Sequence, residues 1–227
     1  MFVSDRMSTD LITAEPSLTI ADAKKIMAEN SIRHLPIINE KGLLVGIVTD
    51  RDLRDAMPST LLKKVDYELT LAKIMNYPVS DIMTEKPLTI YAYFTLQDAL
   101  LVMMEKRKVG ALPVIDEKGY LKGILATRDL LAAFVNVMGI DEPGSLLCII
   151  ADAKLGQLKK IVDIVTEENI SLGSVLVARF WDKEKRAIFP YLLTNNLVNV
   201  KKKLIAAGFE LIDPMKWYLD QLAHVEE

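Results

Sequence analysis

A threonine and an aspartate, three positions apart at the start of an expected helix, are the first candidates for chemistry. Thr49 and Asp52 follow the apolar run from Gly46 to Val48, which predicts a strand that turns into a helix. A helix start presents unpaired N–H groups and partial positive charge, which suit phosphate or hydroxyl groups. The carboxylate can accept hydrogen bonds from sugar hydroxyls. The same spacing is also a common helix cap, so spacing alone leaves both functions open.

The same turn occurs a second time, after the apolar run that begins at Gly123. Asp129 takes the place of Asp52, but Ala126 replaces the threonine and has no hydroxyl with which to cap. An aspartate kept without its capping partner favours ligand binding at Asp129. The sequence therefore predicts two candidate sites of unequal polarity.

These turns belong to a longer internal repeat. The matching segments are Val3–Met7 with Val79–Met83, Thr19–Ala23 with Thr95–Ala99, and Leu35–Gly42 with Leu112–Gly119. Each copy is predicted to run strand, helix, strand, strand, helix, with Thr19 and Thr95 as helix caps. The expected fold class is α/β (α+β). The first copy is expected at 1–57, a linker with a helix around 61–75 at 58–77, and the second copy at 78–138.

The Leu-Pro-hydrophobic-hydrophobic strand, the Gly-hydrophobic-hydrophobic-Thr-x-x-Asp turn and their duplication resemble a tandem pair of CBS domains, or Bateman module, over residues 1–138. The resemblance implies two half-modules packed sheet to sheet, with two clefts that commonly bind adenine nucleotides or other adenosyl compounds. It also implies that Asp52 binds the ribose, and that Arg33 and His34, just before Leu35, bind the phosphates. A solvated strand-end charge and a packing histidine are the alternatives for that basic pair.

The second copy has Gly110 and Ala111 in place of the basic pair, so we expect unequal clefts. The first is expected to prefer a charged nucleotide such as AMP, ADP or ATP. The second, with mainly Asp129, is expected to be weak, empty or suited to an uncharged adenosine moiety, as in an S-adenosylmethionine-type compound. Arg51 and Arg128 lie within the turns, where they can reach a phosphate or pair with nearby acids.

The repeat stops after Gly139, and Asp141-Glu142-Pro143-Gly144 predicts a hinge at 139–145. Residues 146–227, including a C-terminal tail, are expected to form a second domain of ferredoxin-like order, βαββαβ. Its predicted strands are 146–151, 172–181, 187–193 and 209–212, its helices are 157–169 and 197–207, and a charged turn is expected at 182–186.

A glycine at the first strand-to-helix turn makes this second domain resemble an ACT domain, a small regulatory fold associated with amino-acid binding. Asp152, Gly156 and Gln157 surround that turn and are its candidate ligand residues. Leu155 and Ser171 stand where the family usually has proline and asparagine, so a dimerisation domain without a ligand is the alternative. A Bateman module followed by an ACT domain is the layout of acetoin-utilisation AcuB-like proteins.

Composition narrows the function classes. A net charge of −3 and a pI near 5.6 argue against nucleic acid or an anionic membrane as partner. The single cysteine, Cys148, lies in an apolar run and cannot form an intrachain disulfide. We see no signal peptide and no apolar run long enough to span a bilayer, so a cytoplasmic location is expected. Neither metal-ligand spacing nor a catalytic constellation is apparent, so no metal, cofactor or enzymatic activity is expected.

These observations predict a regulatory protein that senses an adenosyl ligand in the CBS pair and relays its binding to the ACT-like domain through the hinge. The relay would act on a regulated protein that the sequence does not identify. A homodimer is expected, because both resembled modules usually pair through self-complementary faces. The competing hypothesis is a dimerisation or interaction scaffold that binds no ligand. An accessory role in acetoin metabolism is the third.

Overall fold

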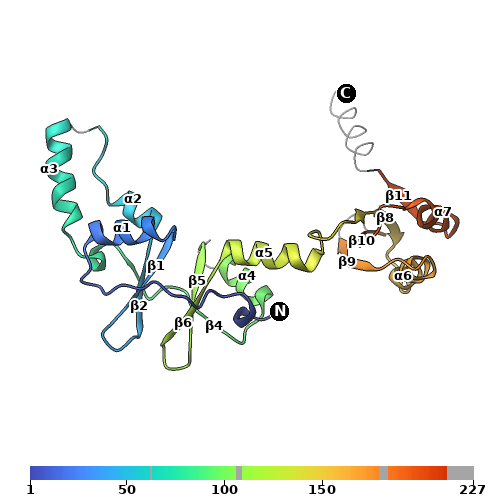
Figure 1. The fold of residues 1–227 in the computed structure, drawn as a ribbon, viewed down its shortest axis with the longest axis horizontal. Helices are drawn as coiled ribbons and strands as arrows, with labels where there is room; N and C mark the ends of the chain where they lie inside the picture. Colours follow the sequence, from blue (N-terminus) through green and yellow to red (C-terminus); the bar gives the residue numbers. More distant parts are fainter. Residues whose placement is uncertain (62, 106–108, 179–183, 214–227) are drawn as a thin grey trace. The chain divides into compact units, whose positions relative to one another are not determined.

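Each copy of the repeat forms a small sheet around an antiparallel strand pair, with helices packed beside it (Figure 1). The computed structural model describes residues 1–61, 63–105, 109–178 and 184–213, and the chain divides into two units, 1–131 and 132–227. The first copy contains η1 (Val3–Asp5), α1 (Ile20–Glu29), β1 (His34–Ile38), β2 (Leu44–Thr49) and α2 (Asp50–Asp55). The second copy contains η2 (Val79–Asp81), β3 (Thr84–Glu85), β4 (Ile90–Tyr91), α4 (Leu96–Glu105), β5 (Ala111–Ile115), β6 (Leu121–Ala126) and α5 (Thr127–Met138).

The predicted helix caps are confirmed. The Thr19 hydroxyl accepts a hydrogen bond from the Asp22 amide at 3.1 Å, and Thr95 does the same for Asp98. Helix α1 then buries Ile20 and Met27, in step with the helical period, so its apolar face covers the sheet of its own copy. The first strand expected in the first copy is not a strand. It consists of single bridges, such as the one between Ser8 and Ile124.

The N-terminal segments are exchanged between the copies. Strand β3 belongs to the second copy in sequence but pairs with β2 of the first copy. Val79, also from the second copy, is fully buried in the core of the first. In the opposite direction, the Val3 amide donates to the Phe94 carbonyl at 2.8 Å, and Ser8 pairs with Ile124. The start of each copy thus joins the sheet of the other, as strand β3 in the first copy and as a single bridge at Ser8 in the second.

Two motif glycines allow this exchange. A Cβ at Gly46 would lie 2.5 Å from the Met83 sulfur, and a Cβ at Gly123 would lie 2.6 Å from the Met7 sulfur. Each methionine comes from the N-terminal segment of the other copy. Both glycines therefore leave room for a side chain that crosses between the copies.

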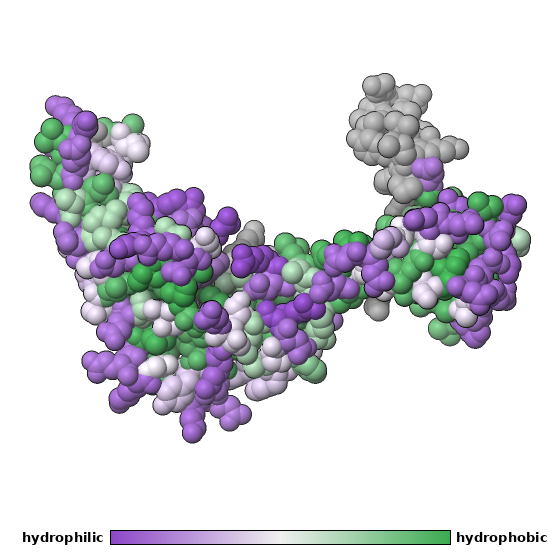
Figure 2. All heavy atoms as spheres, in the orientation of Figure 1, coloured by the Kyte–Doolittle hydropathy of each residue, from purple (hydrophilic) through white to green (hydrophobic). Residues whose placement is uncertain are grey.

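The linker between the copies forms helix α3 (Lys64–Met75). It buries none of its residues fully, but its last turn packs Ile74 and Met75 against the core of the first copy. Val65 and Leu69 are exposed, and Figure 2 shows hydrophobic surface on this helix.

The second unit is an antiparallel sheet with two helices. Its elements are β7 (Ser145–Leu146), β8 (Cys148–Asp152), α6 (Gln157–Glu167), β9 (Leu172–Ala178), β10 (Lys185–Leu192), α7 (Val198–Ala206) and β11 (Glu210–Ile212). Strands β7 and β8 both pair with β10, so they occupy one place in the sheet. The order across the sheet is β11-β8-β10-β9, as a βαββαβ chain requires. The core lies between the helices and one face of the sheet, around Ile149, Ile161 and Leu204.

The prediction of a charged turn at 182–186 is wrong in part. Lys185 and Arg186 lie in β10, where Arg186 pairs with Ala151 of β8. Asp182 and Lys183 lie outside the described residues, as does the C-terminal tail from 214 onward. The strand begins earlier than predicted because the backbone pairs regardless of side-chain charge, and both side chains stay exposed.

Candidate functional site

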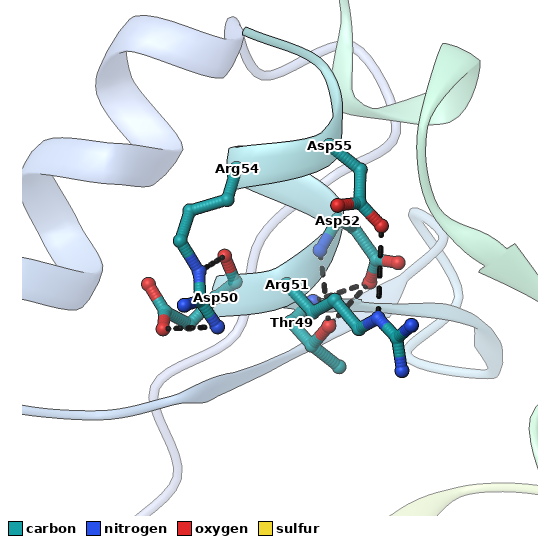
Figure 3. A network of polar contacts seen from close by, with 6 residues as sticks. All are labelled: Thr49, Asp50, Arg51, Asp52, Arg54 and Asp55. Carbon is teal, nitrogen blue, oxygen red and sulfur yellow. Dashed lines mark hydrogen bonds and ion pairs between the residues drawn. The ribbon is translucent and has the colours of Figure 1, made fainter.

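The first strand-to-helix turn is a complete helix cap (Figure 3). The Thr49 hydroxyl accepts from the Asp52 amide at 3.3 Å and donates to the Asp52 Oδ2 at 2.7 Å. The Thr49 amide also donates to that same oxygen, at 2.7 Å. The capping alternative is therefore present in the structure, and it engages the Asp52 Oδ2.

The second turn keeps half of this cap. The Ala126 amide donates to the Asp129 Oδ2 at 2.7 Å, as the Thr49 amide does in the first copy. The Asp129 carboxylate thus caps this turn without a threonine hydroxyl, so the loss of that hydroxyl does not by itself favour ligand binding at Asp129. The Thr127 hydroxyl, one residue later, donates to the Gly110 carbonyl at 3.1 Å.

The first cleft has a volume of about 330 Å³. It is bordered by the first turn, by the starts of β1 and β5, and by the segment around β3. Its lining residues are Arg33, His34, Ile47, Thr49, Asp50, Arg51, Arg54, Thr84, Pro87, Leu88, Val109, Gly110 and Ala111. Asp52 is not among the residues that line it.

The second cleft is larger, about 750 Å³. It is the counterpart of the first, with the roles of the two copies reversed: the turn comes from the second copy and the N-terminal segment from the first. Its lining residues are Ser8, Asp10, Leu11, Ile12, Asn30, Ser31, Ile32, Arg33, His34, Pro36, Gly110, Ile124, Ala126, Thr127, Arg128 and Asp129.

Arg33 and His34 line both clefts. The expectation that this basic pair distinguishes the first cleft from the second is therefore wrong. The cause is the reversal of roles: the strand starts of both copies lie between the clefts, so residues there border both. Asp129, by contrast, lines only the second cleft, together with Arg128.

His34 is a neutral imidazole near pH 7. Burial lowers the pKa of its ring below 6.5, the nearby Arg33 charge lowers the pKa further, and Asp52 opposes both. A neutral ring can donate one hydrogen bond and accept another, and an approaching phosphate would favour its protonated form.

The arginines of the turns form exposed ion pairs, and the Arg54 Nε also donates to the Asp50 carbonyl at 3.3 Å. Arg51 lies 3.6 Å from Asp55 through its Nε, and Arg54 lies 3.2 Å from Asp50 (Figure 3). The Arg51 side chain is 84% exposed, and such surface pairs contribute about 0–1 kcal/mol. Either guanidinium can therefore exchange its partner for a phosphate at little cost. Arg128 is similarly exposed and lies 3.9 Å from Asp129.

The segments before the first helix of each copy line the clefts and were missed by the sequence analysis. Leu11 and Ile12 line the second cleft, and Pro87 and Leu88 hold the corresponding places in the first. The repeat of Val-Ser-Asp-x-Met just before them indicated that these segments are equivalent. It did not indicate that each serves the cleft whose turn comes from the other copy.

In the second unit, the structure brings together two of the three residues expected around a ligand turn. Asp152 and Gln157 line a polar cleft of about 290 Å³, together with Lys160 and Lys185. A hydrogen bond from Lys154, 2.9 Å away, lowers the pKa of Asp152. Gly156 does not line the cleft; its φ of +86° explains the glycine, because side chains are strained there.

Within the described ranges, no three His, Cys, Asp or Glu side chains come together in a way that would hold a metal ion. None of the helices described is long and apolar enough to cross a bilayer. Cys148 is buried on β8, and burial raises the pKa of its thiol, which disfavours the reactive thiolate.

A family model described as CBS domain matches residues 3–59 and 79–136. Among curated proteins, a CBS domain-containing protein of Dictyostelium discoideum is 38% identical over 145 residues, covering 64% of this chain and 99% of that protein. A homoserine O-acetyltransferase of Methanococcoides burtonii is 33% identical over 131 residues, covering 56% of this chain. An inosine-5'-monophosphate dehydrogenase of Helicobacter pylori is 28% identical over 204 residues, covering 86% of this chain. The chain spans only 23% and 39% of the lengths of these two enzymes.

Solved structures resemble the first part of the chain. The CBS-pair protein CBSX2 from Arabidopsis thaliana is 30% identical, with a TM-score of 0.51, covering 59% of this chain and 94% of that chain. A candidate acetoin utilization protein (AcuB) from Vibrio cholerae is 27% identical, with a TM-score of 0.51, covering 63% of this chain and 98% of that chain.

Proposed function

Because the chain belongs to the CBS-domain family, we propose that it is a regulatory protein, not an enzyme, whose clefts bind adenine nucleotides or other adenosyl compounds. The observation that carries the proposal is the pair of clefts, each lined by a capped turn and by Arg33 and His34. Their volumes of about 330 and 750 Å³ match those of small-molecule sites.

The lining residues suit the three parts of such a ligand. Arg33 can hold a phosphate with Arg51 in the first cleft and with Arg128 in the second, because guanidinium–phosphate bonds are strong and often bidentate. Sugar hydroxyls fit beside Thr49 in the first cleft and Asp129 in the second. Asp52 caps the first turn but does not line the first cleft, so we assign it to positioning of that turn.

The base has an apolar surface in each cleft. Pro87 and Leu88 supply it in the first cleft, and Leu11 and Ile12 in the second. Small-molecule sites typically combine such apolar walls with a few polar groups that fix the orientation of the ligand. The expected ligands are therefore AMP, ADP, ATP and S-adenosylmethionine-type compounds.

A scaffold without a ligand is the competing function, and one observation favours it. Asp52 and Asp129 both satisfy helix N-termini, so neither needs a ligand to explain its presence. Under this alternative the clefts are spaces left by the packing of the two copies.

A thermal-shift panel of AMP, ADP, ATP, S-adenosylmethionine and NAD separates the two functions. A ligand that binds the folded chain at 100 times its Kd adds about 2.7 kcal/mol to the free energy of unfolding, so the Tm should rise and saturate. Arg33→Ala should reduce the rise for phosphorylated ligands. Lys24→Ala, which removes an equal charge from an exposed position outside both clefts, should not. No shift with any adenosyl compound would favour the scaffold.

We further propose that the second unit is an ACT-like partner of the CBS pair and that the chain is a homodimer. Helix α5 supports pairing, because Leu131, Phe134 and Val137 are each at least half exposed and recur every three residues along it. The polar cleft around Asp152 and Gln157 is where an amino-acid ligand would be sought. The likeness to the AcuB protein supports an accessory role in acetoin utilisation as a third proposal.

A further inference from the structure

The two clefts meet at a single pair of polar side chains. Each cleft takes its turn from one copy and its apolar wall from the other, whereas the strand starts of both copies lie between them. Arg33, His34 and Gly110 line both clefts. Any ligand group that binds at this centre is therefore bound by residues that also border the neighbouring cleft.

The centre is basic on one side only. The positions of the second copy that match Arg33 and His34 are Gly110 and Ala111, which offer no charged or polar side chain. Gly110 also gives space to the first copy: a Cβ there would lie 3.1 Å from the His34 Nε2. Among the residues that the structure describes, one guanidinium and one imidazole thus border both clefts, and the second copy has no cation at the two matching positions.

We propose that this sharing couples the clefts, so that the pair binds one phosphorylated adenosyl ligand tightly and a second one weakly. A phosphate in one cleft engages Arg33 and leaves the other cleft without its shared cation. Uncharged adenosyl compounds make no such demand and fill both clefts independently. This inference rests on the proposed function and specifies how the two sites are regulated by each other.

The size of the coupling follows from the group that is shared. Each cleft keeps arginines that the other lacks, Arg51 and Arg54 in the first and Arg128 in the second, so the second ligand is weakened and not excluded. Losing one charge-assisted contact should weaken the second binding step roughly tenfold. The two phosphate charges also repel each other, which acts in the same direction.

Calorimetric titration of the full chain with AMP and with adenosine tests the coupling. Two matched variants isolate each cleft: Thr84→Trp fills the first and Ser8→Trp fills the second. Both residues are exposed, and both join their sheet through the backbone, so a larger side chain leaves the pairing intact. Each variant gives the affinity of one cleft when its neighbour is blocked.

The expected result is that the second AMP binds the unmodified chain about tenfold more weakly than AMP binds the weaker single-cleft variant. For adenosine the two values should agree. Arg33→Gln in the unmodified chain should bring the AMP values together, while Lys24→Gln should not. A second AMP that binds as tightly as in the single-cleft variant overturns the coupling but leaves the proposed function standing. Absence of binding by both AMP and adenosine overturns the proposed function itself.

Discussion

Replacing Thr49 with alanine converts the first turn into the form that the second turn already has. The substitution removes the hydroxyl that accepts from the Asp52 amide at 3.3 Å and donates to its carboxylate at 2.7 Å. The backbone bond from residue 49 to Asp52 remains, and it matches the bond from Ala126 to Asp129, also 2.7 Å. The repeat therefore contains both states of the same cap.

The expected cost is about 1 kcal/mol of unfolding free energy, since losing a threonine N-cap typically costs about 0.5–2 kcal/mol. We expect a cost near the middle of this range, because the two hydrogen bonds of the Thr49 hydroxyl differ in length. The bond from the Asp52 amide is long, whereas the bond to the Asp52 carboxylate is short and partly buried. The reverse change, Ala126→Thr, should add a similar amount, because Ala126 is partly exposed and has room for the larger side chain. The double variant should return close to the starting stability.

Urea unfolding of the full chain, followed by circular dichroism, measures these differences as shifts of the midpoint at constant slope. Thr60→Ala is the control, because it removes an exposed threonine that caps no helix. If Thr49→Ala leaves the midpoint unchanged, or Ala126→Thr lowers it, the hydroxyl does not stabilise the turn, and the capping argument is refuted.

Three further predictions concern other parts of the chain. Gly46→Ala should lower the free energy of unfolding by about 1–3 kcal/mol, because the added Cβ would lie 2.5 Å from the Met83 sulfur. In a double-mutant cycle measured by urea unfolding, Met83→Ala should recover much of this loss. Fully additive effects of the two substitutions would contradict the contact. The lowered pKa of His34 means that the unfolded chain binds a proton below pH 6.5 while the folded chain does not, so the unfolding free energy should fall as the pH drops from 6.5 towards the folded pKa. His34→Gln should flatten that part of the pH profile, and an unchanged slope in a series of urea titrations would disprove the assignment. Phe134→Glu places a charge on the exposed apolar face of α5 and should shift the chain from dimer to monomer in sedimentation velocity. Leu155→Glu, at a fully exposed turn residue, should leave the dimer intact. Equal effects of the two substitutions would argue against α5 as the interface.

The helix caps and the central strands of each copy could be predicted from local signals. The caps at Thr19 and Thr95 and the strand that begins at Leu35 depend on neighbours in sequence, and the structure has them where the sequence placed them. The sharing of Arg33 and His34 could not be predicted, because a repeat shows that two segments are equivalent without showing which copy each one packs on. The cap at Asp129 was missed because its donor is a backbone amide. Every residue except proline supplies such a donor, so the residue type gives no signal for it.

The exchanged N-terminal segments have a consequence for folding. Val79 completes the core of the first copy, and the Val3 segment joins the second through the Phe94 carbonyl. The first copy cannot complete its sheet and core until the second has been synthesised, and the second packs on the start of the first, so the pair should fold in one cooperative transition that waits for contacts distant in sequence. A chain cut between the copies would leave the first half without strand β3 and the second half without the segment around Val3 and Ser8. Such halves would be expected to recover their fold only by finding each other.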